Sequence, residues 1–299
     1  MARKYAYAIA AWMALAFTPA GAAEATEESN SAGDAVWEAA SAAMQKGPTK
    51  VDLREQAQLQ LPGGYGFVPI KEGKAVMELL GNQTDERFLG LIFPSNDSEW
   101  FVTVEYEESG YIKDDDARNW DADELLQSLK DGTEAANEHR KEIGVSPIEV
   151  TRWVEPPAYE SATHRLIWSA EARDKSGKDD DPTVNYNTYV LGREGYISLN
   201  LITSAATVAV DKRSAKELIG AVEFNTGKRY SDFSASTDKV AAYGLAALVG
   251  GIAAKKLGLL AMAGVFILKF AKVILIGAVA FGGAIFKFFK GRGNSGTAA

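Results

Sequence analysis

"VNYNTYVLGREGYISLNLI", the stretch from Val184 to Ile202, contains two runs rich in β-branched and aromatic residues. Such runs favour β-strands, because these side chains pack well on a pleated surface. Four residues from Gly192 to Gly195, "GREG", separate the two runs. A loop this short joins antiparallel neighbours in a hairpin, so the stretch predicts an antiparallel sheet.

The pattern of strands and helices continues outward from this hairpin. Strands are expected at residues 57–61, 65–70, 88–93, 100–106, 148–154 and 164–172, and helices at residues 34–46, 73–80, 121–143 and 214–222. The strands at 57–61 and 65–70 flank a Pro-Gly-Gly turn and are expected to pair with each other. Many strands with few helices between them predict an α+β fold, an antiparallel sheet with flanking helices. The order of these elements is similar to that of Mog1/PsbP-like domains.

Charge is distributed unevenly along the 299 residues. All 40 Asp and Glu precede residue 239, whereas residues 239–299 include several basic residues and no acidic one. Nucleic acid binding needs a positive face on the folded domain, so the acidic body argues against nucleic acid as a partner. The chain contains no cysteine, which excludes thiol nucleophiles, disulfides and cysteine-ligated metals.

The first residues have the order of a secretory signal peptide, with a basic start, an apolar run and then small residues. The expected division is a signal peptide at 1–23, a leader and first helix at 24–47, an exported α+β domain at 48–226, a linker at 227–239, a membrane segment at 240–290 and a basic, flexible tail at 291–299. The main domain is therefore expected in the periplasm, at a bacterial inner membrane.

Lysines interrupt the apolar sequence of the predicted membrane segment. At about 1.5 Å per residue, none of the apolar runs between them crosses a hydrocarbon core of about 30 Å. On a helix, Lys255, Lys269, Lys272, Lys287 and Lys290 fall within one side, and we expect this side to meet the membrane surface or its headgroups.

Three arrangements of this segment are open. A single transmembrane helix would place Lys287 and Lys290 in the cytoplasm, as the positive-inside rule favours, while Lys269 or Lys272 would extend toward the interface. Two short spans could form a hairpin instead, or the segment could lie flat with its lysines toward headgroups. The single helix with a cytoplasmic C-terminus is preferred. Small residues at intervals of four also permit self-association through the tail.

Several stretches carry a resemblance to a known group of proteins: "LPGGYGFVP" (Leu61–Pro69), "SGYIKDDDARNWDADELL" (Ser109–Leu126), "EPPAYESATHRLIW" (Glu155–Trp168) and "TDKVAAYGLAALVGG" (Thr237–Gly251). By these stretches the chain resembles a bacterial family of membrane-anchored proteins of unknown function. The resemblance implies an exported domain with a C-terminal membrane segment. It implies no established activity and no catalytic residues.

The densest acidic run contains Asp114, Asp115 and Asp116, which are candidate ligands for a hard cation such as calcium. The run lacks the ligand spacing and central glycine of an EF-hand, and a solvated loop before a helix is the preferred interpretation. His164 is a candidate acid or base, but no G-x-S-x-G motif accompanies it. No catalytic residue, metal or cofactor is therefore assigned.

The sequence favours a non-catalytic module, tethered to the membrane, that binds an envelope ligand or protein. Its expected partners are the lipid bilayer and an envelope protein or a second copy of the chain. One alternative is a metal-dependent or carboxylate-based periplasmic enzyme that uses the acidic run and His164. Another is a role of the tail in membrane assembly.

Overall fold

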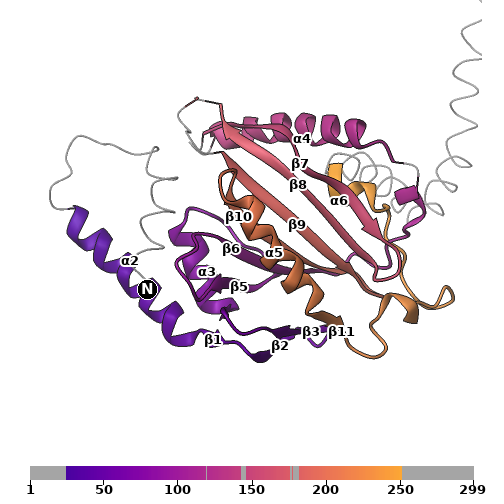
Figure 1. The fold of residues 1–299 in the computed structure, drawn as a ribbon, viewed down its shortest axis with the longest axis horizontal. Helices are drawn as coiled ribbons and strands as arrows, with labels where there is room; N and C mark the ends of the chain where they lie inside the picture. The colour runs from indigo at the N-terminus through magenta and orange to yellow at the C-terminus, as the bar shows by residue number, and fades with distance from the viewer. Residues whose placement is uncertain (1–24, 119, 143–145, 176, 178–181, 251–299) are drawn as a thin grey trace, which may run out of the picture. The chain divides into compact units, whose positions relative to one another are not determined.

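The computed structural model describes residues 25–250, apart from residues 119, 143–145, 176 and 178–181 (Figure 1). Its helices are α2 (Ala25–Ala43), α3 (Ile70–Leu79), α4 (Ala122–Glu142), α5 (Val208–Gly220) and α6 (Ala246–Gly250), with short 3-10 helices η2 (Asp115–Arg118) and η3 (Tyr230–Asp232). Its strands are β1 (Gln45–Lys46), β2 (Thr49–Leu53), β3 (Ala57–Leu61), β4 (Tyr65–Pro69), β5 (Phe88–Pro94), β6 (Phe101–Glu107), β7 (Ile148–Glu160), β8 (Arg165–Asp174), β9 (Thr183–Leu191), β10 (Tyr196–Ser204) and β11 (Val222–Phe224). The predicted α+β fold is confirmed.

Two antiparallel sheets form the framework. The larger has eight strands in the order β1-β4-β5-β6-β10-β9-β8-β7, and the smaller has three in the order β11-β3-β2. The hairpin of β9 and β10 is confirmed, with Leu191 opposite Tyr196 beside the loop. The middle of the larger sheet is the pairing of β6 with β10, which brings together strands from the two halves of the chain.

One face of the larger sheet packs against α5 and the smaller sheet. Alternate residues of β10, Ile197, Leu199 and Leu201, are buried on this face, as the period of two in a strand requires. They pack with Leu218 of α5 and Leu59 of β3 in one continuous apolar cluster. In Figure 1, α5 lies in front of β9 and β10. This layer is the main core of the domain.

The opposite face is covered in two separate places. Helices α2 and α3 cover β4 and β5, where Trp37 packs edge-on against Phe93 with ring centroids 5.8 Å apart. Helices α4 and α6 cover β7 and β8, where Trp168 and Leu166 are buried. Between these two apolar clusters lie β6, β10 and β9, whose side chains on this face are largely polar. The fold thus leaves an uncovered polar strip in the middle of the sheet.

The predicted pairing of residues 57–61 with residues 65–70 is wrong. Strand β3 pairs with β2 and β11 in the smaller sheet, whereas β4 pairs with β1 and β5 in the larger one. The turn between β3 and β4 therefore carries the chain from one sheet to the other. The physical reason is burial: Tyr65 to Val68 of β4 are all buried, so this strand needs apolar cover on both faces, which a two-stranded hairpin cannot supply.

The part of the chain just before residue 251 packs against the domain. The predicted linker, 227–239, contains the buried Tyr230, and Asp238 forms a salt bridge with Arg193 (2.6 Å). The predicted membrane segment begins at Val240, yet Leu245 and Val249 are buried against α4. Apolar residues on both sides of Val240 therefore find partners on the domain.

The first helix also differs from its prediction, since α2 begins at Ala25 and ends at Ala43, in place of the expected 34–46. Within the residues that the structure describes, no helix is long and apolar enough to cross a membrane. The predicted signal peptide at 1–23, the tail at 291–299 and the five lysines from Lys255 to Lys290 lie outside the described residues.

Candidate functional site

The three consecutive aspartates of the acidic run have three different environments. Asp114 accepts a hydrogen bond from the Tyr159 hydroxyl at 2.8 Å. Asp115 is exposed in η2. Asp116 accepts hydrogen bonds from the backbone N–H groups of Leu245 (3.1 Å) and Ala246 (3.0 Å), at the start of α6. The run is thus divided between a contact to the sheet and a contact to the C-terminal segment.

Tyr159 joins Asp114 to His164, the histidine that the sequence singled out. The Tyr159 hydroxyl oxygen lies 3.1 Å from His164 Nδ1, and the imidazole packs against Tyr230 with ring centroids 4.2 Å apart. Burial, followed by the hydrogen bond to Asp114, raises the pKa of Tyr159. Burial also lowers the pKa of His164, against the opposing effect of the Asp114 charge. Both groups are therefore neutral near pH 7, and the chain of Asp114, Tyr159 and His164 connects the loop before η2, the end of β7 and the turn between β7 and β8.

Carboxylates of the acidic run form hydrogen bonds within the fold. Among the described residues, no group of three or more carboxylate or imidazole side chains is placed to hold a metal ion. Asp121, further along the run, accepts backbone hydrogen bonds from Asp123 (2.8 Å) and Glu124 (3.1 Å) and so caps α4. A second acidic stretch, residues 179–181, lies outside the described residues.

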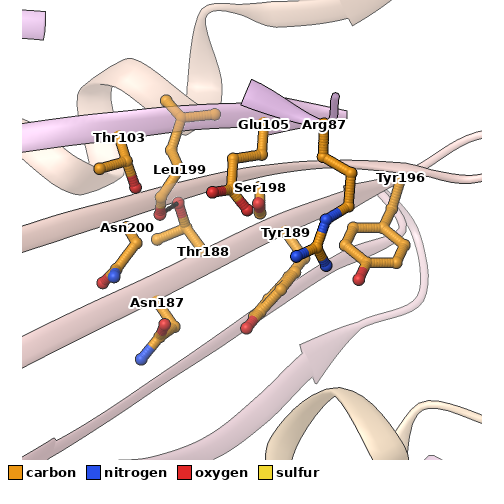
Figure 2. A pocket seen from close by; sticks show the side chains of 10 residues that line it. All are labelled: Arg87, Thr103, Glu105, Asn187, Thr188, Tyr189, Tyr196, Ser198, Leu199 and Asn200. Carbon is orange, nitrogen blue, oxygen red and sulfur yellow. Dashed lines mark hydrogen bonds between the residues drawn. The ribbon is translucent and has the colours of Figure 1, made fainter. Parts of the chain in front are cut away.

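A cavity of about 230 Å³ lies over the uncovered strip of the larger sheet (Figure 2). It lies where three neighbouring strands present polar side chains to the same face. The residues that line it are Arg87, Thr103, Glu105, Asn187, Thr188, Tyr189, Tyr196, Ser198, Leu199 and Asn200. We call this site the sheet cleft. None of these residues has a function predicted from the sequence.

Strand register arranges the cleft side chains in rows. Asn200 of β10 is opposite Thr103 of β6 and Asn187 of β9. Two residues along β10, Ser198 is opposite Glu105 on one side and Tyr189 on the other. Neighbouring strands lie about 4.8 Å apart, so each row presents three polar groups within reach of one small molecule. Figure 2 shows these rows side by side.

The first row is largely buried. Thr103 is 9% exposed and Asn187 is 8% exposed. The Asn200 Oδ1 atom is buried and has no hydrogen-bond partner among the described residues. A buried acceptor without a partner costs about 1–3 kcal/mol, so most buried polar atoms in proteins are paired. Asn200 therefore lies where a bound molecule could supply the missing donor.

The second row contains the half-buried carboxyl of Glu105. Burial raises the pKa of Glu105, while the nearby Arg87 charge opposes this effect. No hydrogen bond to the Glu105 carboxylate is found in the described part of the chain. Burial likewise raises the pKa of Tyr189 and of Tyr196, so both phenols keep their protons. The two rings contact each other with centroids 5.6 Å apart.

Arg87 forms the charged wall of the cleft. Its Nε atom lies 2.9 Å from Asp85 Oδ2, and one terminal nitrogen lies 3.1 Å from Glu107 Oε2. The hydrogen bond to Asp85 is the largest of the effects that raise the pKa of Arg87, and the same contact lowers the pKa of Asp85. Arg87 is therefore held by two carboxylates at the rim.

Sequence reasoning missed the cleft because its residues are ordinary in any single strand. Alternate polar residues, such as Ser198 and Asn200, are typical of a strand whose one face meets water. The detectable signal was that the strands at 100–106 and 184–191 both show the same alternation beside the strand at 196–202. Only the strand order places these three segments next to one another.

Comparison of the chain with models of known protein families identifies one matching family. A family model described as a protein of unknown function (DUF2167) matches residues 45–282. The predicted resemblance to a family of unknown function is thereby confirmed, while membrane anchoring stays a prediction. No curated protein matches the chain.

Two solved structures share parts of the architecture. Cyanobacterial PsbP (CyanoP) from Synechocystis sp. PCC 6803 is 13% identical, with a TM-score of 0.36, and the match covers 62% of this chain and 94% of that chain. The Ran-binding protein Mog1p of Saccharomyces cerevisiae is 12% identical, with a TM-score of 0.34, over 62% of this chain and 98% of that chain. At these values the likeness supports no statement about ligands or activity.

Proposed function

This chain belongs to the DUF2167 family of proteins of unknown function, and we propose that its domain is a non-catalytic module that binds a small polar ligand in the sheet cleft. The observation that carries the proposal is the polar strip itself. Sheet faces between two apolar clusters are normally apolar and covered, because burial of apolar surface drives folding. Here three adjacent strands present polar groups at the corresponding positions.

The buried, unpaired Asn200 Oδ1 atom supports a binding role over a structural one. Asn137 provides the contrast, because it is fully buried and holds the backbone of Ile148 with two hydrogen bonds, one donated at 2.8 Å and one accepted at 2.9 Å. An asparagine kept for the fold is paired in this way, whereas Asn200 keeps its acceptor unused. Binding sites commonly contain groups that are suboptimal for stability.

A pair of matched substitutions tests the proposal. We expect Asn200→Leu to leave the free energy of unfolding unchanged or to raise it, because it removes an unpaired buried acceptor. Asn137→Leu should lower it by on the order of 2 kcal/mol, since the Ile148 backbone groups lose their partners. Urea denaturation followed by circular dichroism measures both. A large loss of stability in Asn200→Leu would show that the cleft is part of the structural core and would sink the proposal.

We also propose that the domain is exported and tethered at the bacterial inner membrane by residues after Gly250. Three features of the sequence support this: a signal-like start, an acidic body, and a basic, apolar C-terminal segment without acidic residues. In this proposal the sheet cleft faces the periplasm and Lys287 and Lys290 lie in the cytoplasm.

Cysteine labelling tests the topology, because the chain has no cysteine of its own. A single cysteine at Ser236 should react with an impermeant maleimide on intact spheroplasts, and one at Ser295 should react only after lysis. Labelling of both positions before lysis would contradict a single span. Release of the full chain from membranes by carbonate would contradict the integral tether and favour a segment lying on the surface.

A further inference from the structure

The side chains around the sheet cleft carry more negative than positive charge. Among the lining residues, Arg87 is the only cation and Glu105 the only carboxylate. Arg87 is already paired with Asp85 and Glu107, both outside the cavity lining. Arg87 acts on Glu105 only through its nearby charge, while its ion pairs are made with Asp85 and Glu107. Three carboxylates therefore share one guanidinium, and the site carries excess negative charge.

Two hydrogen-bonding groups of the cleft also favour a ligand that donates hydrogen bonds. The Asn200 Oδ1 atom is a buried acceptor without a donor, and within the described residues no hydrogen bond reaches the Glu105 carboxylate. Glu105 belongs to β6 and Asn200 to the adjacent strand β10, and the two residues lie in neighbouring rows of the cleft. Two acceptors of the cleft therefore have no donor among the described residues.

Two aromatic rings complete the site. Tyr189 and Tyr196 line the cavity beside Glu105, with their rings in edge-to-face contact at 5.6 Å. The face of an aromatic ring attracts a cation, by about 0.5–2 kcal/mol depending on its exposure. A carboxylate next to tyrosine rings is thus suited to a positively charged group.

From this combination of free acceptors, excess negative charge and aromatic rings, we propose that the ligand of the sheet cleft carries a protonated amine. The inference rests on the proposed function of the cleft and specifies its ligand. The ammonium group would donate hydrogen bonds to the Glu105 carboxylate and the Asn200 Oδ1 atom. The cavity of about 230 Å³ limits the ligand to a small molecule.

Anionic and neutral ligands fit less well. An anion would have to take Arg87 from Asp85 and Glu107, at 2.9 Å and 3.1 Å, while approaching Glu105. A neutral ligand could donate to Asn200, but it would leave the Glu105 carboxylate without an ion pair in a partly buried site. Burial of an unpaired charge is costly, and a cation relieves that cost.

Matched probes test the proposal on the full chain in mild detergent. Three scaffolds are each used in a cationic, a neutral and an anionic form: glucosamine, glucose and glucuronic acid; phenethylamine, phenethyl alcohol and phenylacetate; 1,4-diaminobutane, 1,4-butanediol and succinate. Isothermal titration calorimetry gives the affinities. In at least one scaffold we expect the cationic form to bind about tenfold or more tightly than the other two.

Two carboxyl variants assign the effect to the cleft. Glu105→Gln keeps the size of the side chain and should weaken binding of the amine by about tenfold or more. Glu78→Gln removes the same charge from an exposed position on α3 and should leave binding unchanged. The melting temperature of each variant without probe establishes that it is folded, and Asn200→Leu provides a second cleft variant.

The outcomes separate the two proposals. If neutral or anionic probes bind as tightly as the amines, or if Glu105→Gln binds amines normally, the ligand is not recognised as a cation. Binding of neutral probes that Asn200→Leu abolishes would leave the proposed function standing and overturn only this inference. If no probe of any charge binds, both proposals are contradicted.

Discussion

Neighbouring residues of the acidic run show how position in the fold decides the role of a side chain. Asp115 is exposed, whereas Asp116, next to it, accepts the first two N–H groups of the α6 segment. A metal ligand and a helix cap demand the same carboxylate chemistry. The sequence could predict an acidic surface here, but it could not distinguish these two roles, because the capped residues lie far along the chain.

The first prediction compares these two aspartates. Asp116→Ala should lower the free energy of unfolding by about 1 kcal/mol, because the N–H groups of Leu245 and Ala246 lose their acceptor. Asp115→Ala, which removes an exposed carboxylate from the same turn, should change it by less than about 0.5 kcal/mol. Chemical denaturation measures both values. Equal effects of the two substitutions would contradict the capping role.

The second prediction concerns the pH dependence of stability. Burial raises the pKa of Glu105 in the folded protein, with smaller effects of Arg87, Asp85 and Glu107. The folded state therefore binds this proton more tightly than the unfolded state, whose carboxyl has a pKa of about 4.3. As pH rises from that value through the raised folded pKa, the contribution of Glu105 to the free energy of unfolding falls.

Denaturation of wild type and Glu105→Gln between about pH 4 and about pH 8 isolates this contribution. The variant has no carboxyl at this position, so its stability relative to wild type should increase with pH across the window. The difference should become constant above the folded pKa of Glu105. A difference that stays the same at every pH would show that Glu105 titrates alike in the folded and unfolded states.

At the scale of helices and strands, the sequence predicted local elements well and their partners less well. The β9–β10 hairpin followed from a short glycine loop, and α4 (Ala122–Glu142) followed from helical periodicity, because both signals are local. The pairing of β3 with β11 depends on residues near 222, and no local signal contains it. The two-residue β1 and the three-residue β11 are too short to show a period.

The third prediction concerns Leu245, the residue directly before α6. Leu245→Ala should lower the free energy of unfolding by about 2–4 kcal/mol, because Leu245 is fully buried in the cluster that includes Leu125 and Trp168. Val240→Ala, at a position 40% exposed, is the control and should cost less than about 1 kcal/mol. Thermal denaturation of the detergent-solubilised chain measures both. An unchanged melting temperature for Leu245→Ala would show that this segment does not belong to the folded domain.

At the scale of the whole molecule, residues from distant segments build the candidate site. The cleft combines β6, β9 and β10 with Arg87, which precedes β5. Each strand was predicted from the sequence, but the site was not. A polar residue on one strand contributes to a site only together with its neighbours on the adjacent strands, and the sequence does not give the strand order. The predicted export and tether concern residues 1–23 and 240–290, and most of these residues lie outside the described part of the chain.

Two truncations test where the domain ends and form the fourth prediction. A chain ending at Gly250 should unfold at the same denaturant concentration as the full chain, because it keeps α6 and its contacts with α4. A chain ending at Lys239 loses Leu245 and Val249 from the apolar cluster and should be markedly less stable. Equal stability of the two truncated proteins would place the end of the domain before Val240.

The pairing of β6 with β10 also has a consequence for how the protein is made. Strands β1 to β6 leave the ribosome or the export channel first, and β6 then has an open edge until β10 arrives from the second half of the chain. Five residues of β6 are buried in the finished sheet and four of them are apolar, so this edge is both unpaired and largely apolar until β10 arrives. A partly delivered chain is therefore most vulnerable to aggregation at β6, and we expect a holding chaperone to occupy that edge until synthesis has passed residue 204.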